Sequence, residues 1–400
     1  MPDSVTVTSS ESWFSRLASS IKSVLVGLVL FLVAFPVLFW NEGRAVRTAK
    51  SLEVGAGAVV TVPADAVDPA REGKLVHVSG PVSTEGELVD PELGVQAQGV
   101  KLIRRVEMYQ WEEEEKSEKR KKLGGGEETV TTYTYQKGWS NDPIDSSSFQ
   151  EPGGHENPGS FPVQANTVVA DPVHVGAFTL SADQVDQISE GKPLAVTEAM
   201  LASVPEPLGP QLQVSEGRFY LGEQPSAPRV GDVRISFEVV NPATVSLVGV
   251  QTGETFEPYQ AQAGDSILLV EEGNHTAAEM FQAAQSANTV LTWIMRAGGF
   301  LMMFIGLVAV FKPISVFADV VPLVGTMLGA GLGIFAFLLS AAFSILTIAI
   351  AWIFYRPLLG IGLLVLALGG LIWLVSLGRK KKRQRVAVPV PPPPPAPVPA

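Results

Sequence analysis

The chain has 400 residues, of which 46% are hydrophobic, and it contains no cysteine. The lack of cysteine excludes a disulfide framework, a thiol nucleophile and a cysteine-ligated zinc site. The formal net charge of −11 is spread unevenly, because residues 41–292 hold 18 Lys and Arg against 37 Asp and Glu, which leaves +8 for the remainder. An acidic central region beside a basic, apolar remainder argues against nucleic acid as a ligand.

The N-terminal part of the chain combines a polar tail with an apolar stretch. Residues 1–20 are polar and rich in serine, which is typical of a mobile tail. Residues 21–40 contain only Lys22 as a charge and are long enough to cross a bilayer as one helix. A signal peptide would end in small residues, whereas this stretch ends in Phe39 and Trp40, so we predict an uncleaved span.

Residues 41–275 are predicted to form one exported, acidic, β-rich domain. Residues 100–112 and 129–139 alternate apolar and polar side chains, as strands with one buried face do. Between them lies a charge run over 113–128 that contains three consecutive glycines at 124–126. This order predicts a long hairpin with a solvated tip.

The segment before the second span carries a helix start signal. Thr276 and Glu279 fit a capping box, in which each side chain accepts a hydrogen bond from the other residue's backbone amide. Apolar side chains then recur on one helical face, so we predict a helix over 276–311 that runs directly into the second span. Such a helix would couple the β-rich domain rigidly to the membrane.

Residues 296–377 form a nearly unbroken apolar block that holds the remaining spans. Two prolines and one aspartate interrupt this block, which predicts an interfacial or re-entrant segment over 312–327. The third and fourth spans are predicted at 328–355 and 358–377, joined by a tight turn.

Segment 378–400 begins with a basic cluster and ends in a proline-rich tail. The cluster fixes topology under the positive-inside rule and attracts anionic lipid. It comprises Arg379, Lys380, Lys381, Lys382, Arg383 and Arg385. With four spans, both termini are then cytoplasmic. Arg44, Arg47 and Lys50 oppose this orientation, but long domains translocate largely regardless of charge.

The predicted class is therefore an α+β membrane protein, with four transmembrane helices and a large β-rich domain between helices 1 and 2. The protein is expected to be integral and multi-pass. The compartment is either a bacterial inner membrane or, in a eukaryote, the endoplasmic reticulum or inner nuclear membrane.

Two sets of residues among the spans are candidate sites. Gly325, Gly329 and Gly333 recur at intervals of four and lie on one helix face, where they permit close packing of a second helix. Asp319, Lys312 and Arg356 form a possible intramembrane polar site, since ionisable groups among spans are often functional. An aspartate at the cytoplasmic boundary that simply faces water is an equally good interpretation of Asp319.

No catalytic or cofactor motif is present in the sequence. The four histidines lie far apart without the spacing of metal ligands, so we predict no catalytic residues, no metal site and no cofactor. The loop His155-Glu156-Asn157-Pro158 is the single feature that would favour an enzyme, one that modifies lipid at the outer surface.

Several stretches, in order along residues 20–378, resemble the LUMA (transmembrane protein 43) family of four-span membrane proteins. The most specific are Glu107-Met-Tyr-Gln-Trp111 and Phe354-Tyr-Arg-Pro357. The others are Phe39-Trp-Asn-Glu-Gly-Arg-Ala45, Gly73-Lys-Leu-Val-His77 with Ser79-Gly80, Arg104-Arg105-Val106, Tyr133-Thr-Tyr135 with Trp139-Ser140, Arg296-Ala-Gly298 and Trp352-Ile353.

The resemblance implies four spans, a large lumenal or periplasmic domain between the first two, and cytoplasmic termini. In eukaryotes, members resemble scaffolds of the endoplasmic reticulum and inner nuclear membrane, with lamin and emerin as partners. No catalytic residues are established in the family, so none are carried over.

Our leading hypothesis is a non-enzymatic membrane scaffold that binds other membrane proteins through its exported domain and self-associates through its helices. The expected partners are the lipid bilayer, further copies of the chain and other membrane proteins, with no nucleic acid. The alternative is a channel or transporter component that uses Asp319, Lys312 and the third span around a path.

Overall fold

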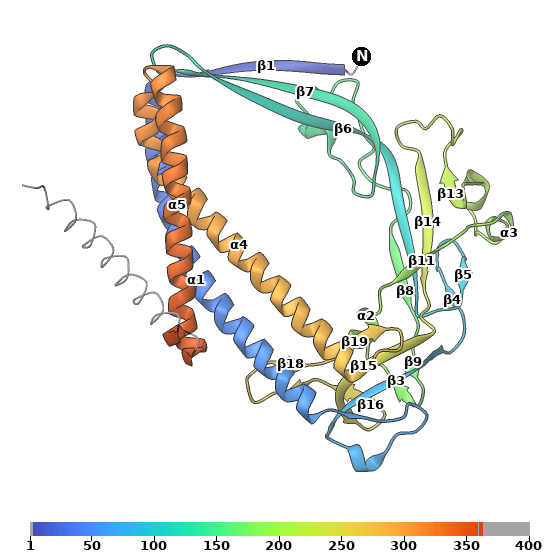
Figure 1. The fold of residues 1–400 in the computed structure, drawn as a ribbon. Coiled ribbons are helices and arrows are strands. Elements are labelled where there is room, and N and C mark those ends of the chain that lie inside the picture. Colours follow the sequence, from blue (N-terminus) through green and yellow to red (C-terminus); the bar gives the residue numbers. More distant parts are fainter. Residues whose placement is uncertain (1–2, 359, 363–400) are drawn as a thin grey trace, which may run out of the picture.

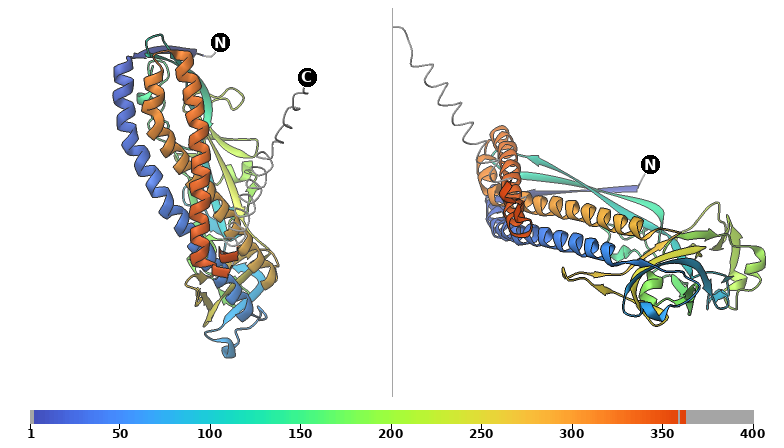
Figure 2. Two further views of the ribbon diagram at one scale, coloured as in Figure 1. Left: turned by 60° about the vertical axis from the view of Figure 1, so that its left-hand side comes forward. Right: turned by 60° about the horizontal axis from the view of Figure 1, so that its bottom comes forward.

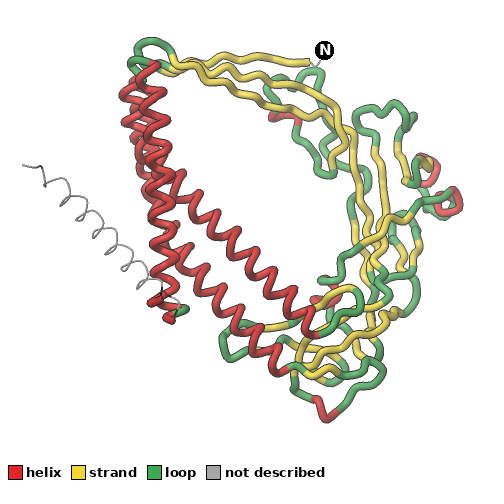
Figure 3. Tube along the Cα trace, viewed as in Figure 1, coloured by secondary structure: helices red, strands yellow, loops and turns green. Residues whose placement is uncertain are grey.

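The computed structural model describes residues 3–358 and 360–362 of the chain. The chain forms an open frame with three parts (Figure 1). Long helices make one side, a β-rich body occupies the lower right corner, and a narrow β ribbon returns across the top to the far end of the helices. Figure 3 shows that helices and strands are segregated, and Figure 2 shows the helices side by side.

Three helices in the described ranges are long and apolar enough to cross a membrane. They are α1 (Trp13–Ala58), α4 (Ala277–Ala318) and α5 (Pro322–Tyr355). At a rise of 1.5 Å per residue, α1 is about 69 Å long, whereas the hydrocarbon core measures about 30 Å. The membrane-distal parts of α1 and α4 therefore form a helical stalk that leads to the body.

The strands of the described residues form two larger sheets and two small pairs. One sheet contains β1 (Asp3–Glu11), β6 (Lys101–Lys121), β7 (Glu127–Ser140), β8 (Asn166–Val169), β11 (Gly191–Leu194), β12 (Leu212–Ser215), β13 (Arg218–Leu221) and β14 (Val233–Val240). The other contains β2 (Val60–Thr61), β3 (Leu75–Thr84), β9 (Val173–Val175), β10 (Phe178–Thr179), β15 (Thr244–Thr252), β16 (Thr255–Glu257) and β19 (Leu269–Glu272). The pairs are β4 (Leu88–Val89) with β5 (Gln96–Ala97), and β17 (Tyr259–Gln260) with β18 (Ser266–Ile267).

Short helices complete the body. These are α2 (Ala182–Asp186), α3 (Glu198–Leu201) and 3-10 turns at Pro69–Arg71, Ser146–Ser148 and Gly209–Gln211. The core of the body takes side chains from both sheets, among them the fully buried Phe219, Phe237, Val78 and Leu247.

A second, smaller core joins the helical stalk to the body. Leu52 of α1 and Met280 and Phe281 of α4 pack against Val248 and Ile267 of the body. The α4 helix begins at the predicted capping box, where Thr276 and Glu279 bind each other's backbone amides. Helix α4 then continues into the apolar region without a break, as predicted.

The predicted hairpin is present, but its strands are longer than expected. β6 and β7 stay paired from Met108–Ser140 to Lys121–Glu127, through the charge run that we assigned to a solvated tip. Cross-strand pairs such as Lys122–Glu128 let these charges stand in a ladder instead of a loop. The turn contains Gly124 and Gly125, both with positive φ.

The N-terminal segment also differs from the prediction of an irregular tail. Residues 3–11 form β1, which pairs antiparallel with β7 from Asp3–Tyr135 to Glu11–Glu127. The alternating Val5, Val7 and threonines suit a strand, and the ribbon of β1, β7 and β6 offers an edge to receive it.

The predicted interfacial or re-entrant segment at 312–327 is wrong. Helix α4 runs through Pro313 to Ala318, and α5 begins at Pro322, so only a short turn separates them. Helix α1 extends beyond both ends of the predicted first span, from Trp13 to Ala58, which leaves the predicted span at 21–40 as one part of a longer helix. The predicted fourth span at 358–377 lies outside the described residues except for 358 and 360–362. The basic cluster at 379–385 lies entirely outside them.

Candidate functional site

Two clusters of charged side chains join distant parts of the chain, one at each end of the apolar region. We call them the belt, at the end nearer the body, and the cap, at the far end. The belt contains Asn41, Glu42, Arg44, Asn288, Thr292, Arg296 and Trp352. The cap contains Arg16, Lys121, Glu127 and Asp319.

One carboxylate at the centre of the belt connects all three long helices. Glu42 of α1 is 2% exposed, and its Oε1 and Oε2 accept hydrogen bonds from Nε and Nη2 of Arg296 on α4 at 2.6 and 2.8 Å. The indole Nε1 of Trp352 on α5 donates to Oε2 at 2.7 Å. Because the bidentate pair is buried, it is electrostatically strong and expensive to break.

Aromatic rings surround this ion pair. The guanidinium of Arg296 lies 4.7 Å from the ring centre of Trp293 and 5.7 Å from that of Trp352, in cation–π geometry. Gly43 lies against Tyr355, so close that an added Cβ would meet its ring. Tryptophan and tyrosine at this level are typical of a membrane–water interface.

A polar layer lies one turn nearer the body. Arg44 donates to Asn288 Oδ1 at 3.0 Å and to Thr292 Oγ1 at 3.1 Å. Asn41 donates to the carbonyl of Thr292 at 3.2 Å, and Asn288 donates to that of Ala45 at 3.0 Å. These bonds fix the register of α1 against α4.

The cap joins the ribbon tip to the far end of the helices. Asp319, 1% exposed, binds Nη2 of Arg16 at 2.7 Å and Nζ of Lys121 at 2.5 Å. Arg16 also lies 3.1 Å from Glu127 and donates to the carbonyl of Gly125 at 2.5 Å. The cap therefore holds α1, the α4–α5 turn and both strands of the ribbon together.

The structure separates the three residues of the predicted intramembrane polar site. Asp319 lies in the cap, where its partners are Arg16 and Lys121. Lys312 and Arg356 are exposed, and Arg356 follows α5 at the opposite end from Asp319. The three side chains therefore do not form one site.

The predicted glycine face has two environments. A Cβ on Gly325 would meet Asp319, and one on Gly329 would meet Ser315, so both glycines face α4 of the same chain. A Cβ on Gly333 would meet no described atom within 4 Å. Self-association through this face stays a prediction, for which Gly333 is the available position.

A close backbone contact between α1 and α4 involves glycines that our sequence analysis did not single out. A Cβ on Gly27 of α1 would lie 2.6 Å from the carbonyl oxygen of Gly306 on α4, and one on Gly306 would lie 2.7 Å from that of Gly27. Gly27 and Gly306 lie in different apolar stretches, and neither belongs to a repeated spacing of small residues. They could have been found only if the packing of α1 on α4 had been known.

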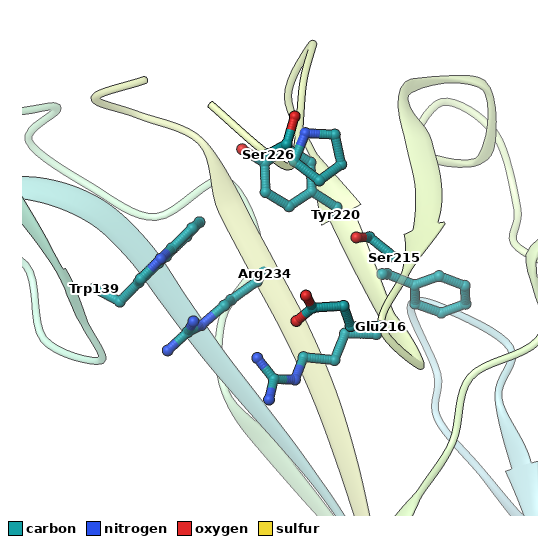
Figure 4. A pocket seen from close by; sticks show the side chains of 9 residues that line it. Trp139, Ser215, Glu216, Tyr220, Ser226 and Arg234 are labelled. Atoms are coloured by element: carbon teal, nitrogen blue, oxygen red, sulfur yellow. The ribbon is translucent and has the colours of Figure 1, made fainter. Parts of the chain in front are cut away.

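The body contains a hollow of about 380 Å³ beside Trp139, Arg234 and Tyr220 (Figure 4). The guanidinium of Arg234 lies 4.5 Å from the ring centre of Trp139 and binds Glu107 at 2.6 and 2.8 Å. This hydrogen bond lowers the pKa of Glu107, whereas burial and the bond to Asp232 raise the pKa of Tyr220. No histidine lines the hollow, so its serines have no general base of that type.

The loop that favoured an enzyme holds structural contacts. His155 stacks on Tyr135, with ring centres 3.9 Å apart, and its Nε2 lies 3.3 Å from Asp3 of β1. Asn157 binds both the amide and the carbonyl of Trp111, at 2.7 and 2.9 Å. Burial, with the bond to Glu113, raises the pKa of Tyr135 to about 12. Within the described ranges, no group of three His, Asp or Glu side chains is arranged to hold a metal ion.

The belt assembles stretches that are far apart in sequence but were quoted together above for the family resemblance. Residues 39–45, 296–298 and 352–357 meet there, while 107–111 and 133–140 pair in the ribbon and body. A motif that unites all three helices is a better marker of this fold than any single span.

Comparison with known proteins identifies the family to which the chain is similar. The family model described as transmembrane protein 43 matches residues 108–357. Transmembrane protein 43 of Rattus norvegicus is 36% identical over 365 residues, which cover 88% of this chain and 90% of the rat protein. The protein of Homo sapiens is 34% identical over 365 residues, with 88% and 90% covered.

The similarity extends beyond vertebrates. The transmembrane protein 43 homolog of Drosophila melanogaster is 32% identical over 356 residues, which cover 87% of this chain and 93% of the fly protein. No solved structure matches the chain. The chain is a membrane protein that belongs to the transmembrane protein 43 (LUMA) family.

Proposed function

We propose that this protein is a non-enzymatic scaffold that holds an exported body in a fixed position relative to its membrane helices and thereby organises other membrane proteins. The observation that carries the proposal is the belt, in which the carboxylate of Glu42 binds α4 and α5 from α1. A buried ion pair shared by three helices resists separation of any one of them.

The junction between stalk and body supports the same function. Leu52, Met280 and Phe281 pack into the body, and α4 starts at its capping box without an intervening linker. A partner bound to the body would therefore keep a defined distance from the membrane. A flexible tether would not provide that distance.

The orientation that we propose places the cap, the N-terminal end of α1 and the C-terminus on the cytoplasmic side and the body on the opposite side, with β1 returning from the cap along β7 so that Asp3 contacts His155. In that orientation the docked ribbon tip lies on the cytoplasmic side, because it binds Arg16 and Asp319. The ribbon then passes from one membrane face to the other. Its strands carry polar side chains on both faces, so water or protein must line that passage.

This requirement favours self-association, since neighbouring copies would shield the ribbon from lipid. The outer face of α5 offers a surface for such contact, with exposed Ile334, Leu338 and Ile345 and the open positions Gly331 and Gly333. The cysteine-free chain is well suited to testing this arrangement.

The proposal is tested by crosslinking in native membranes, followed by purification in mild detergent and mass spectrometry of the intact complex. We expect a defined homo-oligomer together with a stoichiometric membrane protein. Gly333→Leu should weaken the oligomer, whereas Gly298→Leu, at another open helix position, serves as the control.

A monomer without any stoichiometric protein would contradict the scaffold function. Equal stability of the oligomers in Gly333→Leu and in the control would contradict the proposed α5 contact. The partner-binding part of the proposal would then depend on whether a membrane protein copurifies.

A further inference from the structure

Three basic residues that conflict with the proposed orientation lie on α1 at the level of an apolar groove, and one of them, Arg44, lines that groove. Arg44, Arg47 and Lys50 are spaced at three-residue intervals on α1, just beyond Trp40. At 100° per residue they fall within one 120° sector of the helix surface. Within residues 3–358 and 360–362, none of the three forms an ion pair with a carboxylate.

The absence of an acidic partner is unexpected in this part of the molecule, because the surrounding region has a large excess of Asp and Glu. The nearest carboxylate on the loop opposite α1, Asp265, accepts a hydrogen bond from Thr48 instead. Arg44 is satisfied at its two terminal nitrogens by amide and hydroxyl oxygens, which do not neutralise its charge. Its Nε is buried and has no hydrogen-bond partner among the described atoms.

The groove has a volume of about 520 Å³ and lies between α1, α4 and the β18–β19 segment. This size is within the range of about 300–1,000 Å³ for small-molecule sites. Arg44 and Leu52 of α1, Ala284 and Ala287 of α4, and Leu269 of the body contribute to its lining. Most of that lining is apolar, with Arg44 at the end nearer the belt.

The groove lies next to the level that we assign to the membrane surface. Leu291, which also lines it, is two residues before Trp293 and five before Arg296 of the belt. Trp40 and Trp293 are 54% and 64% exposed at this level, as expected for interfacial aromatics. In the proposed orientation, a lipid of the outer leaflet therefore lies beside the groove.

We propose that the groove binds an anionic phospholipid, with the headgroup phosphate at Arg44 and Arg47 and one acyl chain along the apolar lining. The cations supply the charge complement to the headgroup phosphate. The apolar lining distinguishes this ligand from a free phosphate, which gains nothing from it. Glu271 lines the groove as well, which favours the Arg44 end for the headgroup.

The inference goes beyond the scaffold function, because a lipid-binding groove needs neither a protein partner nor self-association. It also gives a role to the basic residues that oppose the positive-inside rule. They recognise lipid at the outer face instead of setting the orientation.

The test uses the full chain in nanodiscs that contain a trace of phosphatidylglycerol with a photoreactive group in its acyl chain. Photolabelled peptides are mapped by mass spectrometry, with the matching phosphatidylcholine probe as comparison and inorganic phosphate as competitor. We expect labelling of peptides over 266–271 and 283–291, at least several-fold stronger with phosphatidylglycerol, and no competition by phosphate.

Four variants locate the site. Ala287→Phe fills the groove and should abolish the labelling, whereas Ser286→Phe, at a neighbouring exposed position outside the groove, should not. Arg47→Gln should reduce the preference for phosphatidylglycerol, and Lys74→Gln on the body should not. Arg44 is left intact, because it also holds α1 to α4.

Equal labelling by the two lipids would overturn the anionic selectivity. Labelling that persists in Ala287→Phe, or that never reaches either groove segment, would overturn the site itself. Competition by inorganic phosphate would show that the cations bind a free anion instead of a lipid headgroup. None of these outcomes depends on whether the protein recruits a partner.

Discussion

The belt and the cap are both buried charge clusters, yet they hold different things together. In the belt, Glu42 and Arg296 come from membrane helices and join helix to helix. In the cap, Arg16 and Asp319 come from helices, but Lys121 and Glu127 come from the ribbon. Loss of the belt should therefore loosen the bundle, whereas loss of the cap should release the ribbon and free only the adjoining ends of α1 and α4.

The two clusters also differ in redundancy. Among the residues that the structure describes, Glu42 is the single carboxylate that binds Arg296, so its removal leaves a buried guanidinium without a counter-ion there. Arg16 has two carboxylates, Asp319 and Glu127. The comparison teaches that loss of one partner destabilises a buried charge more when that partner is the single one than when a second partner remains.

The largest effect is expected from Glu42→Gln. Removing one partner of a buried pair costs about 3–5 kcal/mol, so the free energy of unfolding in detergent should fall by that amount. Glu53→Gln, at an exposed position of the same helix, should change it by less than about 0.5 kcal/mol. If the two variants unfold alike, the belt does not stabilise the bundle.

Asp319→Asn should have a smaller and more local effect, of about 1.5–3 kcal/mol on opening of the cap, because Arg16 keeps Glu127. Hydrogen exchange should speed up at the ribbon tip, 119–128, and stay unchanged at 288–296. Faster exchange in both segments would show that the belt and the cap are coupled, which would contradict their separate roles.

Gly306→Ala tests the helix contact that lies between the two clusters. The new Cβ would lie 2.7 Å from the carbonyl oxygen of Gly27, so the helices must separate, at a cost of about 1–3 kcal/mol. Gly298→Ala on the same helix meets no described atom within 4 Å and is the control. Equal stability of the two variants in denaturant titrations would contradict close packing of α1 on α4.

The smallest effect is expected on the body, away from both clusters. The bond from Arg234 lowers the pKa of Glu107 below its ordinary 4.5, so the pair stabilises the fold fully above pH 4.5. That contribution, about 0.5–1 kcal/mol, is lost as the pH falls through the lowered pKa. Glu107→Gln should flatten this part of the stability–pH curve, and an unchanged slope would mean that the pair contributes nothing.

Local patterns predicted much of the fold. The apolar stretch at 21–40, the capping box at Thr276 and the alternation of 100–112 and 129–139 each specify an element through neighbouring residues. The resemblance of the chain to the transmembrane protein 43 family was also confirmed. The contacts among the stretches 39–45, 296–298 and 352–357 were not visible, since residues such as Glu42 and Arg296 lie 254 positions apart.

The misses share one physical cause, which is tertiary pairing between distant residues. The charge run 113–121 looked like a loop, yet β7 supplies cross-strand partners that make it a strand. The polar residues 3–11 have no buried face of their own and become a strand only at the edge of β7. Pro313 did not end α4, because helix continuation is possible where neighbouring groups satisfy the freed carbonyl.

The central claim is that the belt fixes the body relative to the membrane helices. Lys192→Cys on the body and Ile350→Cys on α5, both at exposed positions of a cysteine-free chain, allow spin labels to report the distance between them. We predict a narrow distance distribution that broadens in Glu42→Gln and stays narrow in Asp319→Asn. A distribution that is broad in the unaltered chain, or that does not respond to Glu42→Gln, would contradict the claim.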